Sequence, residues 1–204
     1  MEQIVLNTDQ KDALQEVANI GAAHAATALS KMVGREIQMG IPKVEVIPLE
    51  RTVDYVIDQE VVTAVFLKIE DGIPLNILLL SSQESSIALS NMLMGKEIDE
   101  KKEILDDMNK SAMKEVGNVI MCAFFDSLTE LLGVSLIPGP PHLACDMPAA
   151  VLDYVLAQLG EVANEAVVFS CEVKEEKGGN FKLDLFLLPS PSSVKIMLEK
   201  LGMG

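Results

Sequence analysis

The chain is poor in basic residues and in the side chains that build disulfide or metal sites. Its 204 residues hold 16 Lys and Arg against 31 Asp and Glu, which gives a formal net charge of −15. Nucleic acids and anionic membranes are bound by clustered Lys and Arg, so both are disfavoured as ligands. The three cysteines have no CxxC spacing and there are two histidines, so neither a disulfide framework nor a metal site is predicted.

Long apolar runs and a secretory leader are also missing. No apolar run approaches the roughly 20 residues of a spanning helix, and the first residues are neither basic nor extensively apolar. We therefore expect a cytoplasmic protein with no membrane insertion. With 49% hydrophobic and 23% charged residues, the composition is typical of a globular protein.

An internal repeat is the strongest feature of the sequence. Residues 9–42 and 108–141 share nine identities in 34 pairs at an offset of 99. About two would be expected by chance from ordinary residue frequencies. Residues 80–95 resemble 187–202 at an offset near 107. The additional residues of the second copy are placed most simply in 149–166.

The repeat predicts how the chain is organised. We expect a single domain, residues 1–204, made of two repeats at about 8–95 and 107–202. Because neither copy can easily bury its apolar face alone, the two are expected to share one core by pseudo-two-fold packing.

Periodicity predicts one long helix in each repeat. In 9–33 and in the matching part of the second copy, apolar residues recur on one stripe at about 100° per residue. Thr8 or Asp9 is expected to cap the first helix, and Gly34 and Gly133 to end the two helices. A further helix over 99–110 is expected to lead into the second long helix.

The remaining patterns predict antiparallel strands and short helices. The β-branched and aliphatic runs predict strands at 44–48, 61–69, 73–80, 167–173 and 181–188. Turns are expected at 71–72 and 178–180, and short helices at 83–94 and 191–201. The fold class is therefore α+β, a mixture of helices and a mainly antiparallel sheet shared by the two repeats.

Three polar residues of the first long helix are predicted to point away from the core. If Leu14 faces the core at 0°, then Asp12, Glu16 and Asn19 project at about 160°, 200° and 140°. Ser111, Glu115 and Asn118 have the same directions in the second helix. A solvated helix face does not require Asn, which is a mediocre helix former, so the survival of Glu-x-x-Asn in both copies favours a function.

A carboxylate and a carboxamide on a rigid helix lack a strong nucleophile and an adjacent base. The amide can both donate to and accept from a water molecule, and the carboxylate can pair with a cation on another protein. This suits hydrolysis of an already activated phosphoryl group, in which catalysis is mostly positioning.

The motif resembles that of a known family. Asp/Ser-x3-Glu-x2-Asn-x22-Pro is the signature of the CheC/CheX/FliY phosphatases, which dephosphorylate the chemotaxis response regulator CheY. The sequence matches it twice without a gap, at Asp12, Glu16, Asn19 and Pro42 and again at Ser111, Glu115, Asn118 and Pro141. Two motifs in 204 residues, with no room for an additional motor domain, favour the CheC branch.

The resemblance implies a role for each matched residue. Asn19 and Asn118 would each orient the water that attacks the aspartyl phosphate of phosphorylated CheY. Glu16 and Glu115 would each pair with the Lys of the CheY active site.

The other matched residues would support these contacts. Asp12 and Ser111 would contribute to the surface contact, and Pro42 and Pro141 would fix the loop after each helix. Any Mg2+ would belong to CheY, so the chain is expected to need no cofactor of its own.

The resemblance also implies a second partner and leaves alternatives open. CheD binds CheC and raises its activity, and Asp146 is either a CheD contact or an ordinary acid at a strand edge. The chain is either the phosphatase, a non-catalytic regulator that binds CheY or CheD, or a component of the flagellar switch like the middle part of FliM. The two intact Glu-x-x-Asn pairs favour the enzyme.

Overall fold

The computed structural model describes residues 7–55, 60–71, 73–96, 105–159, 164–175 and 180–200. The same order of elements occurs twice along the chain. The first series is α1 (Thr8–Val33), β1 (Ile37–Met39), β2 (Lys43–Pro48), the 3-10 helix η1 (Leu49–Tyr55), β3 (Val62–Asp71), β4 (Leu75–Ser82) and α2 (Gln83–Leu93). The second is α3 (Asp107–Leu132), β5 (Ile137–Pro138), β6 (His142–Asp146), α4 (Pro148–Leu159), β7 (Glu165–Glu175), β8 (Asn180–Pro189) and α5 (Pro191–Lys200).

The described strands form one antiparallel sheet to which both series contribute. The order along the sheet is β1-β7-β8-β4-β3-β5, with β2 also pairing with β7 and β6 with β3. The central neighbours β4 and β8 come from different series and pair in the register Leu78↔Phe186. The short strands of each series pair with a long strand of the other series. The strands β1 and β2 pair with β7, and β5 and β6 pair with β3.

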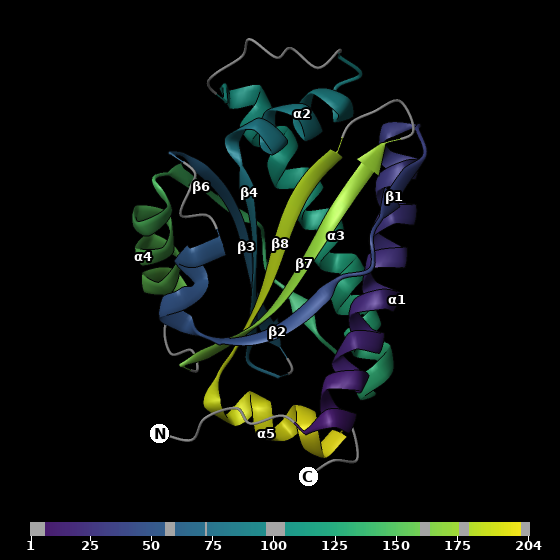
Figure 1. Ribbon diagram of the computed structural model, residues 1–204, viewed down its shortest axis with the longest axis vertical. Helices are drawn as coiled ribbons and strands as arrows, with labels where there is room; N and C mark the ends of the chain where they lie inside the picture. The colour runs from purple at the N-terminus through teal and green to yellow at the C-terminus, as the bar shows by residue number, and fades with distance from the viewer. Residues whose placement is uncertain are drawn as a thin grey trace.

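This pairing confirms the α+β fold class. The helices α2 and α5 lie at opposite ends of the molecule in Figure 1, as a pseudo-two-fold arrangement requires. The repeat limits of about 8–95 and 107–202 stay a prediction. The predicted strands and the short helices predicted at 83–94 and 191–201 are present, as β2, β3, β4, β7, β8, α2 and α5. The elements β1, β5, β6, η1 and α4 are not foreseen. The expected turns lie partly outside the described residues, at 72 and 176–179.

The sheet is covered by helices on both faces. The larger core lies between the sheet and the pair α1 and α3, and it includes Val17, Phe124 and Phe169. The smaller core lies on the opposite face under α4, where Val151 and Val155 pack with Phe66 and Phe186. Figure 1 shows α1 and α4 on opposite sides of the sheet, with α1 and α3 running in opposite directions.

The two long helices begin at polar caps and end at glycines. Asn7 caps α1 through a reciprocal pair of hydrogen bonds with Gln10, so the expectation of a cap at Thr8 or Asp9 is wrong. The reason is local: Asn7 has extended backbone angles, whereas the helix already begins at Thr8. Gly34 and Gly133 end the helices with φ of 67° and 61°, as predicted.

The expected lead-in helix over 99–110 is wrong at 105–106, and 107–110 already belong to α3. Leu105 and Asp106 are not helical, and Asp106 is the N-cap of α3, where its side chain accepts the Asn109 N–H. Residues 97–104 lie outside the described residues. The Asn109 side chain is fully buried and donates to Ser90 Oγ at 2.7 Å and to Asn91 Oδ1 at 3.2 Å, which ties the start of α3 to α2.

Glycines allow α3 to lie close to both of its neighbours. A Cβ added at Gly117 would lie 2.7 Å from Cβ and Cγ1 of Val65 in β3. A Cβ added at Gly21 of α1 would lie 2.5 Å from Cδ2 of Phe124 in α3. Both distances are shorter than any ordinary carbon contact, so the positions of α1 and α3 depend on these two missing side chains.

Candidate functional site

The polar motif residues lie on the outer faces of α1 and α3. Asp12, Glu16, Ser111 and Glu115 are exposed, and Asn19 and Asn118 are half-buried. The opposite face of α1 is buried at Leu14, Val17 and Ala18. The corresponding residues of α3, Met113, Val116 and Gly117, are buried as well. The predicted outward direction of both motifs therefore agrees with the structure.

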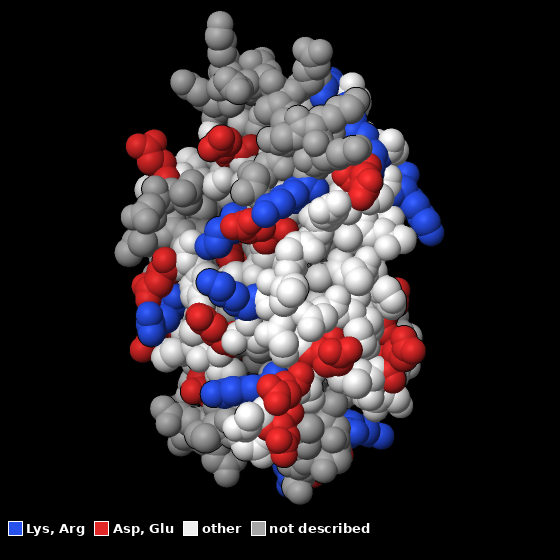
Figure 2. Space-filling model, turned by 45° about the vertical axis from the view of Figure 1, so that its right-hand side comes forward, with Lys and Arg blue, Asp and Glu red and all other residues white. Residues whose placement is uncertain are grey.

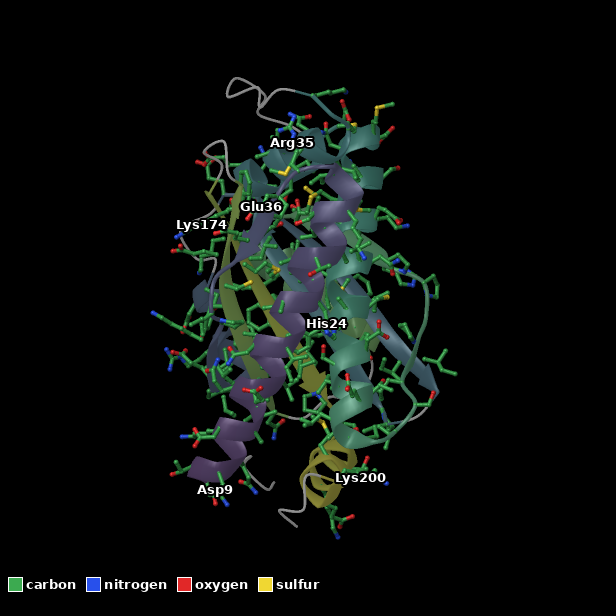
Figure 3. The ribbon with its side chains drawn as sticks, turned by 90° about the vertical axis from the view of Figure 1, so that its right-hand side faces the viewer. Asp9, His24, Arg35, Glu36, Lys174 and Lys200 are labelled. Carbon is green, nitrogen blue, oxygen red and sulfur yellow. The ribbon has the colours of Figure 1, made fainter. Side chains whose placement is uncertain are left out.

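Both motifs face the same side of the molecule. The helices α1 and α3 pack on the same face of the sheet, so their outer faces point away from it together. Figure 3 shows the two helices side by side, with His24 of α1 between them. His24 Nδ1 and Ser127 Oγ of α3 lie 3.3 Å apart, which links the helices near the middle of this surface.

The side chain of Asn19 is held by a neighbour that the motif does not contain. Gln15, one helical turn earlier, donates its Nε2 to Asn19 Oδ1 at 3.1 Å. The same Nε2 donates to the main-chain carbonyl of Pro42 at 2.8 Å. The first motif thus contains a direct connection between its Asn and its Pro, although the two are far apart in sequence.

The side chain of Asn118 has a different partner. The thiol of Cys122, one turn later, donates to Asn118 Oδ1 with 3.6 Å between sulfur and oxygen. Burial raises the pKa of the Cys122 thiol above its ordinary value, and the nearby carboxylates of Asp126 and Glu115 raise it further. The group therefore stays a protonated donor at neutral pH. This also makes it a poor nucleophile, since reactive cysteines have lowered pKa values.

The two motif prolines are placed unequally. Pro42 is buried and lines a small apolar gap, with Ala22 and Ala25 of α1 on one side and Phe169 of β7 on another. Pro141 is half-buried in the loop before β6. The carbonyl of Pro42 accepts a hydrogen bond from Gln15 of α1. Lys114 takes the place of Gln15 in α3, and its side chain is exposed.

The motif surface is acidic and offers no metal cluster. Asp9, Asp12 and Glu16 are exposed along the first half of α1. Figure 2 shows acidic side chains gathered on the lower part of this side, and a band of Lys and Arg beside a broad area with few charges. Among the described residues, no three His, Cys, Asp or Glu side chains lie close enough to hold a metal ion. None of the described helices has the length and apolarity to cross a membrane.

Asp146 lies apart from the helix motifs, on the sheet. It is exposed at the end of β6, and its Oδ1 accepts the Met147 N–H at 2.8 Å. Met147 is 62% exposed, so an acidic and an apolar side chain are both accessible at this point. Its role as a CheD contact stays a prediction.

Two functional neighbours were missed from the sequence. Gln15 and Cys122 each touch the motif Asn of their helix from a position four residues away. The i,i+4 spacing is visible in the sequence and is the one signal that points to them. The contact of Gln15 with the Pro42 loop has no sequence signal, because its acceptor is a main-chain carbonyl.

Comparisons with known proteins agree with this geometry. Residues 10–46 match the CheC-like family. The chain is 26% identical over 200 residues to the CheY-P phosphatase CheC of Bacillus subtilis, covering 97% of this chain and 96% of that protein.

Two solved structures share the fold. The crystal structure of Thermotoga maritima FliY matches with a TM-score of 0.79 and 24% identity, and the match covers 98% of each chain. A CheX-CheY-BeF3-Mg2+ complex from Borrelia burgdorferi matches with a TM-score of 0.50 and 18% identity over 83% of this chain and 95% of that chain. In sequence the chain is therefore similar to the CheC-like family, and in fold it is similar to FliY, with the doubled motif on the outer faces of its two long helices.

Proposed function

We propose that this chain is a phosphatase of phosphorylated CheY, acting through two sites on one surface. The observation that carries the proposal is that both Glu-x-x-Asn pairs lie on the outer faces of two helices that cover the same side of the sheet. The proposal is supported by the similarity to the CheY-P phosphatase CheC of B. subtilis and by the fold shared with CheX, which has been solved together with CheY.

The half-buried amides on the outer helix faces suit the chemistry of an acyl phosphate. Such a group is already activated, so a catalyst mainly has to hold a water molecule in line with the phosphorus atom. Asn19 and Asn118 each keep an NH2 group that is not used by the hydrogen bonds of their Oδ1 atoms. Inserted into the CheY site, this amide would contact the attacking water and set its direction.

The carboxylates of Glu16 and Glu115 would hold the partner in place. Both are exposed and lie one turn before the Asn, so they are free to pair with a Lys ammonium group of CheY. A pair that becomes desolvated on docking is stronger than an exposed one, which gives the contact specificity. Mg2+ would be supplied by CheY, and this chain would act without a metal of its own.

Water is favoured over a protein nucleophile. Cys122 is the thiol nearest to a motif Asn, and its raised pKa keeps it protonated. Ser111 is exposed, and no described side chain accepts its hydroxyl proton as a base would. Neither residue is prepared for covalent catalysis, so the transferred group would pass directly to water.

The proposal is tested by following the loss of phosphate from phosphorylated CheY. The unaltered protein should accelerate the loss, and Asn19→Ala combined with Asn118→Ala should remove at least about 99% of the acceleration. Thr27→Ala combined with Lys31→Ala, on the exposed face of α1 away from the motif, is the matched control and should stay active. No acceleration by the unaltered protein, with or without CheD, would leave only a binding role.

We further propose that CheD is a partner and that the protein acts in the cytoplasm, where a response regulator is found. The exposed pair of Asp146 and Met147 is the proposed CheD contact. Asp146→Lys should weaken CheD binding at least about tenfold while dephosphorylation without CheD is unchanged. Unaltered CheD binding would identify Asp146 as an ordinary acid at a strand edge.

A further inference from the structure

The first motif contains a shared hydrogen-bond donor. Gln15 is half-buried between α1 and the loop before β2, and its Nε2 has two acceptors. The distances are 2.8 Å to the Pro42 carbonyl oxygen and 3.1 Å to Asn19 Oδ1. One NH2 group has two hydrogens, so both contacts are full hydrogen bonds.

The Pro42 carbonyl fixes the orientation of both amides. A main-chain carbonyl can only accept, so the Gln15 atom that faces it must be the NH2 nitrogen. That nitrogen can only donate, so the Asn19 atom that faces it must be the oxygen. The NH2 group of Asn19 is thereby directed away from Gln15. An amide without such a partner can rotate by 180° about its last bond and present either end.

The second motif has no equivalent of this chain of contacts among the described residues. Lys114 takes the place of Gln15 and is exposed. Asn118 Oδ1 instead accepts from the Cys122 thiol at 3.6 Å, and a thiol is a weak donor. Nothing in the described part of the chain connects Asn118 to the loop that contains Pro141.

We propose that Gln15 is a positioning residue of the first site, which transmits the polarity of the Pro42 carbonyl to the amide of Asn19. This rests on the proposed phosphatase function of Asn19. It also gives a physical reason for the distance between Asn and Pro in the first motif. The buried Pro42 ring anchors the loop, and the carbonyl of the same residue determines, through Gln15, the orientation of the Asn19 amide.

The kinetic test isolates the first site with Asn118→Ala. In that background, Gln15→Met keeps the length of the side chain but removes both donors. The turnover number towards phosphorylated CheY should fall about tenfold, while KM and the affinity for CheY stay within about twofold. A residue with a merely structural role would change the thermal midpoint or KM instead. An unchanged turnover number would overturn the proposal.

Two matched variants make this test specific. Gln15→Glu carries only acceptors at neutral pH, so it should lower turnover at least as much as Gln15→Met. Lys114→Met in the Asn19→Ala background removes the corresponding side chain of the second site and should leave turnover within about twofold. An equal fall in both sites would overturn the assignment of Gln15, because it would then reflect general damage to the helix face.

A second measurement is independent of catalysis. The side-chain NH2 resonances of Asn19, observed by NMR in 15N-labelled protein without CheY, should shift when Gln15 is changed to Met. They should not shift in the Lys114→Met variant. If the unaltered protein is inactive, the phosphatase proposal fails, and if only the Asn118→Ala protein is inactive, the proposed activity of the first site fails. In both cases these resonances still decide whether Gln15 orients Asn19. Unmoved Asn19 resonances in Gln15→Met would refute the bridge even if the enzyme is active.

Discussion

Gly117→Ala tests whether the close approach of α3 to the sheet determines the position of Asn118. Helix propensity alone predicts that this substitution stabilises the protein by about 1 kcal/mol. The structure predicts the opposite, because the new Cβ would lie 2.7 Å from Cβ and Cγ1 of Val65, where ordinary contact begins at 3.4 Å. A gap of about 0.7 Å would have to open between α3 and β3.

The loss of stability in Gly117→Ala depends on whether β3 or α3 moves to make room for the new Cβ. Cβ of Val65 is fixed to β3, which pairs with β4 on one side and β6 on the other. The helix must therefore move outward, and Asn118 moves with it. Overpacking of this kind costs about 1–3 kcal/mol. After the propensity gain is subtracted, we expect a net loss of about 1 kcal/mol in the free energy of unfolding.

The matching position of the first helix provides the control. Ala18 of α1 is fully buried and already carries the Cβ that Gly117 lacks. Ala18→Gly should therefore destabilise the protein by about 1–2 kcal/mol, through helix propensity and the loss of a buried methyl group. Urea unfolding of both variants measures the two losses. If Gly117→Ala is more stable than the unaltered protein, the reasoning about close approach is refuted.

Three further predictions test the core and the docking contact. Burial and the nearby carboxylate of Asp184 raise the pKa of Cys171 from near 9 to about 12. The thiol therefore loses its proton at lower pH in the unfolded chain than in the folded one, so the free energy of unfolding should fall above pH 9 by about 1.4 kcal/mol per pH unit. Cys171→Ala should remove that slope in pH-dependent unfolding and Cys145→Ala should not; equal slopes in all three proteins would contradict the shift. Asn109→Ala leaves its partners in α2 without their donor and should cost about 1–3 kcal/mol of unfolding free energy, whereas a loss below about 0.5 kcal/mol would mean that the contact is dispensable. Glu16→Gln with Glu115→Gln should weaken CheY binding at least about tenfold in calorimetry and more so at low salt, and undiminished affinity would count against the ion pair.

The parts of the fold that were predicted correctly are those with strong local signals. The apolar stripes of α1 and α3 run over many turns, and Gly34 and Gly133 end them with left-handed angles that favour glycine. The paired strands are long apolar runs. By contrast, β1 and β5 have three and two residues, too few to show alternation, and they exist because an edge strand of the other repeat offers partners.

The sequence also did not predict that the matching elements η1 and α4 differ, η1 being a short 3-10 helix and α4 an α-helix. Both follow the second strand of their repeat, but only α4 buries apolar residues deeply enough, at Val151 and Val155, to form a full core layer. That depends on the sheet surface underneath, which is assembled from both repeats. Tertiary context of this kind is not contained in local propensity.

The outward direction of the motif side chains could be predicted from the sequence, whereas the hydrogen bonds that orient the Asn19 amide could not. Helical arithmetic from Leu14 is enough to place Glu16 and Asn19 opposite the core. The orientation of the Asn19 amide depends on Gln15 and on a carbonyl in the Pro42 loop, so it requires the folded position of that loop.

The central claim is that two outward-facing amides each direct water at the phosphate of CheY. It is tested most directly by measuring the decay of phosphorylated CheY with the unaltered protein, Asn19→Ala, Asn118→Ala and the double variant side by side. The account predicts that the two single variants retain partial activities that add up to that of the unaltered protein, and that the double variant decays at the rate of CheY alone. Full acceleration by the folded double variant would contradict it.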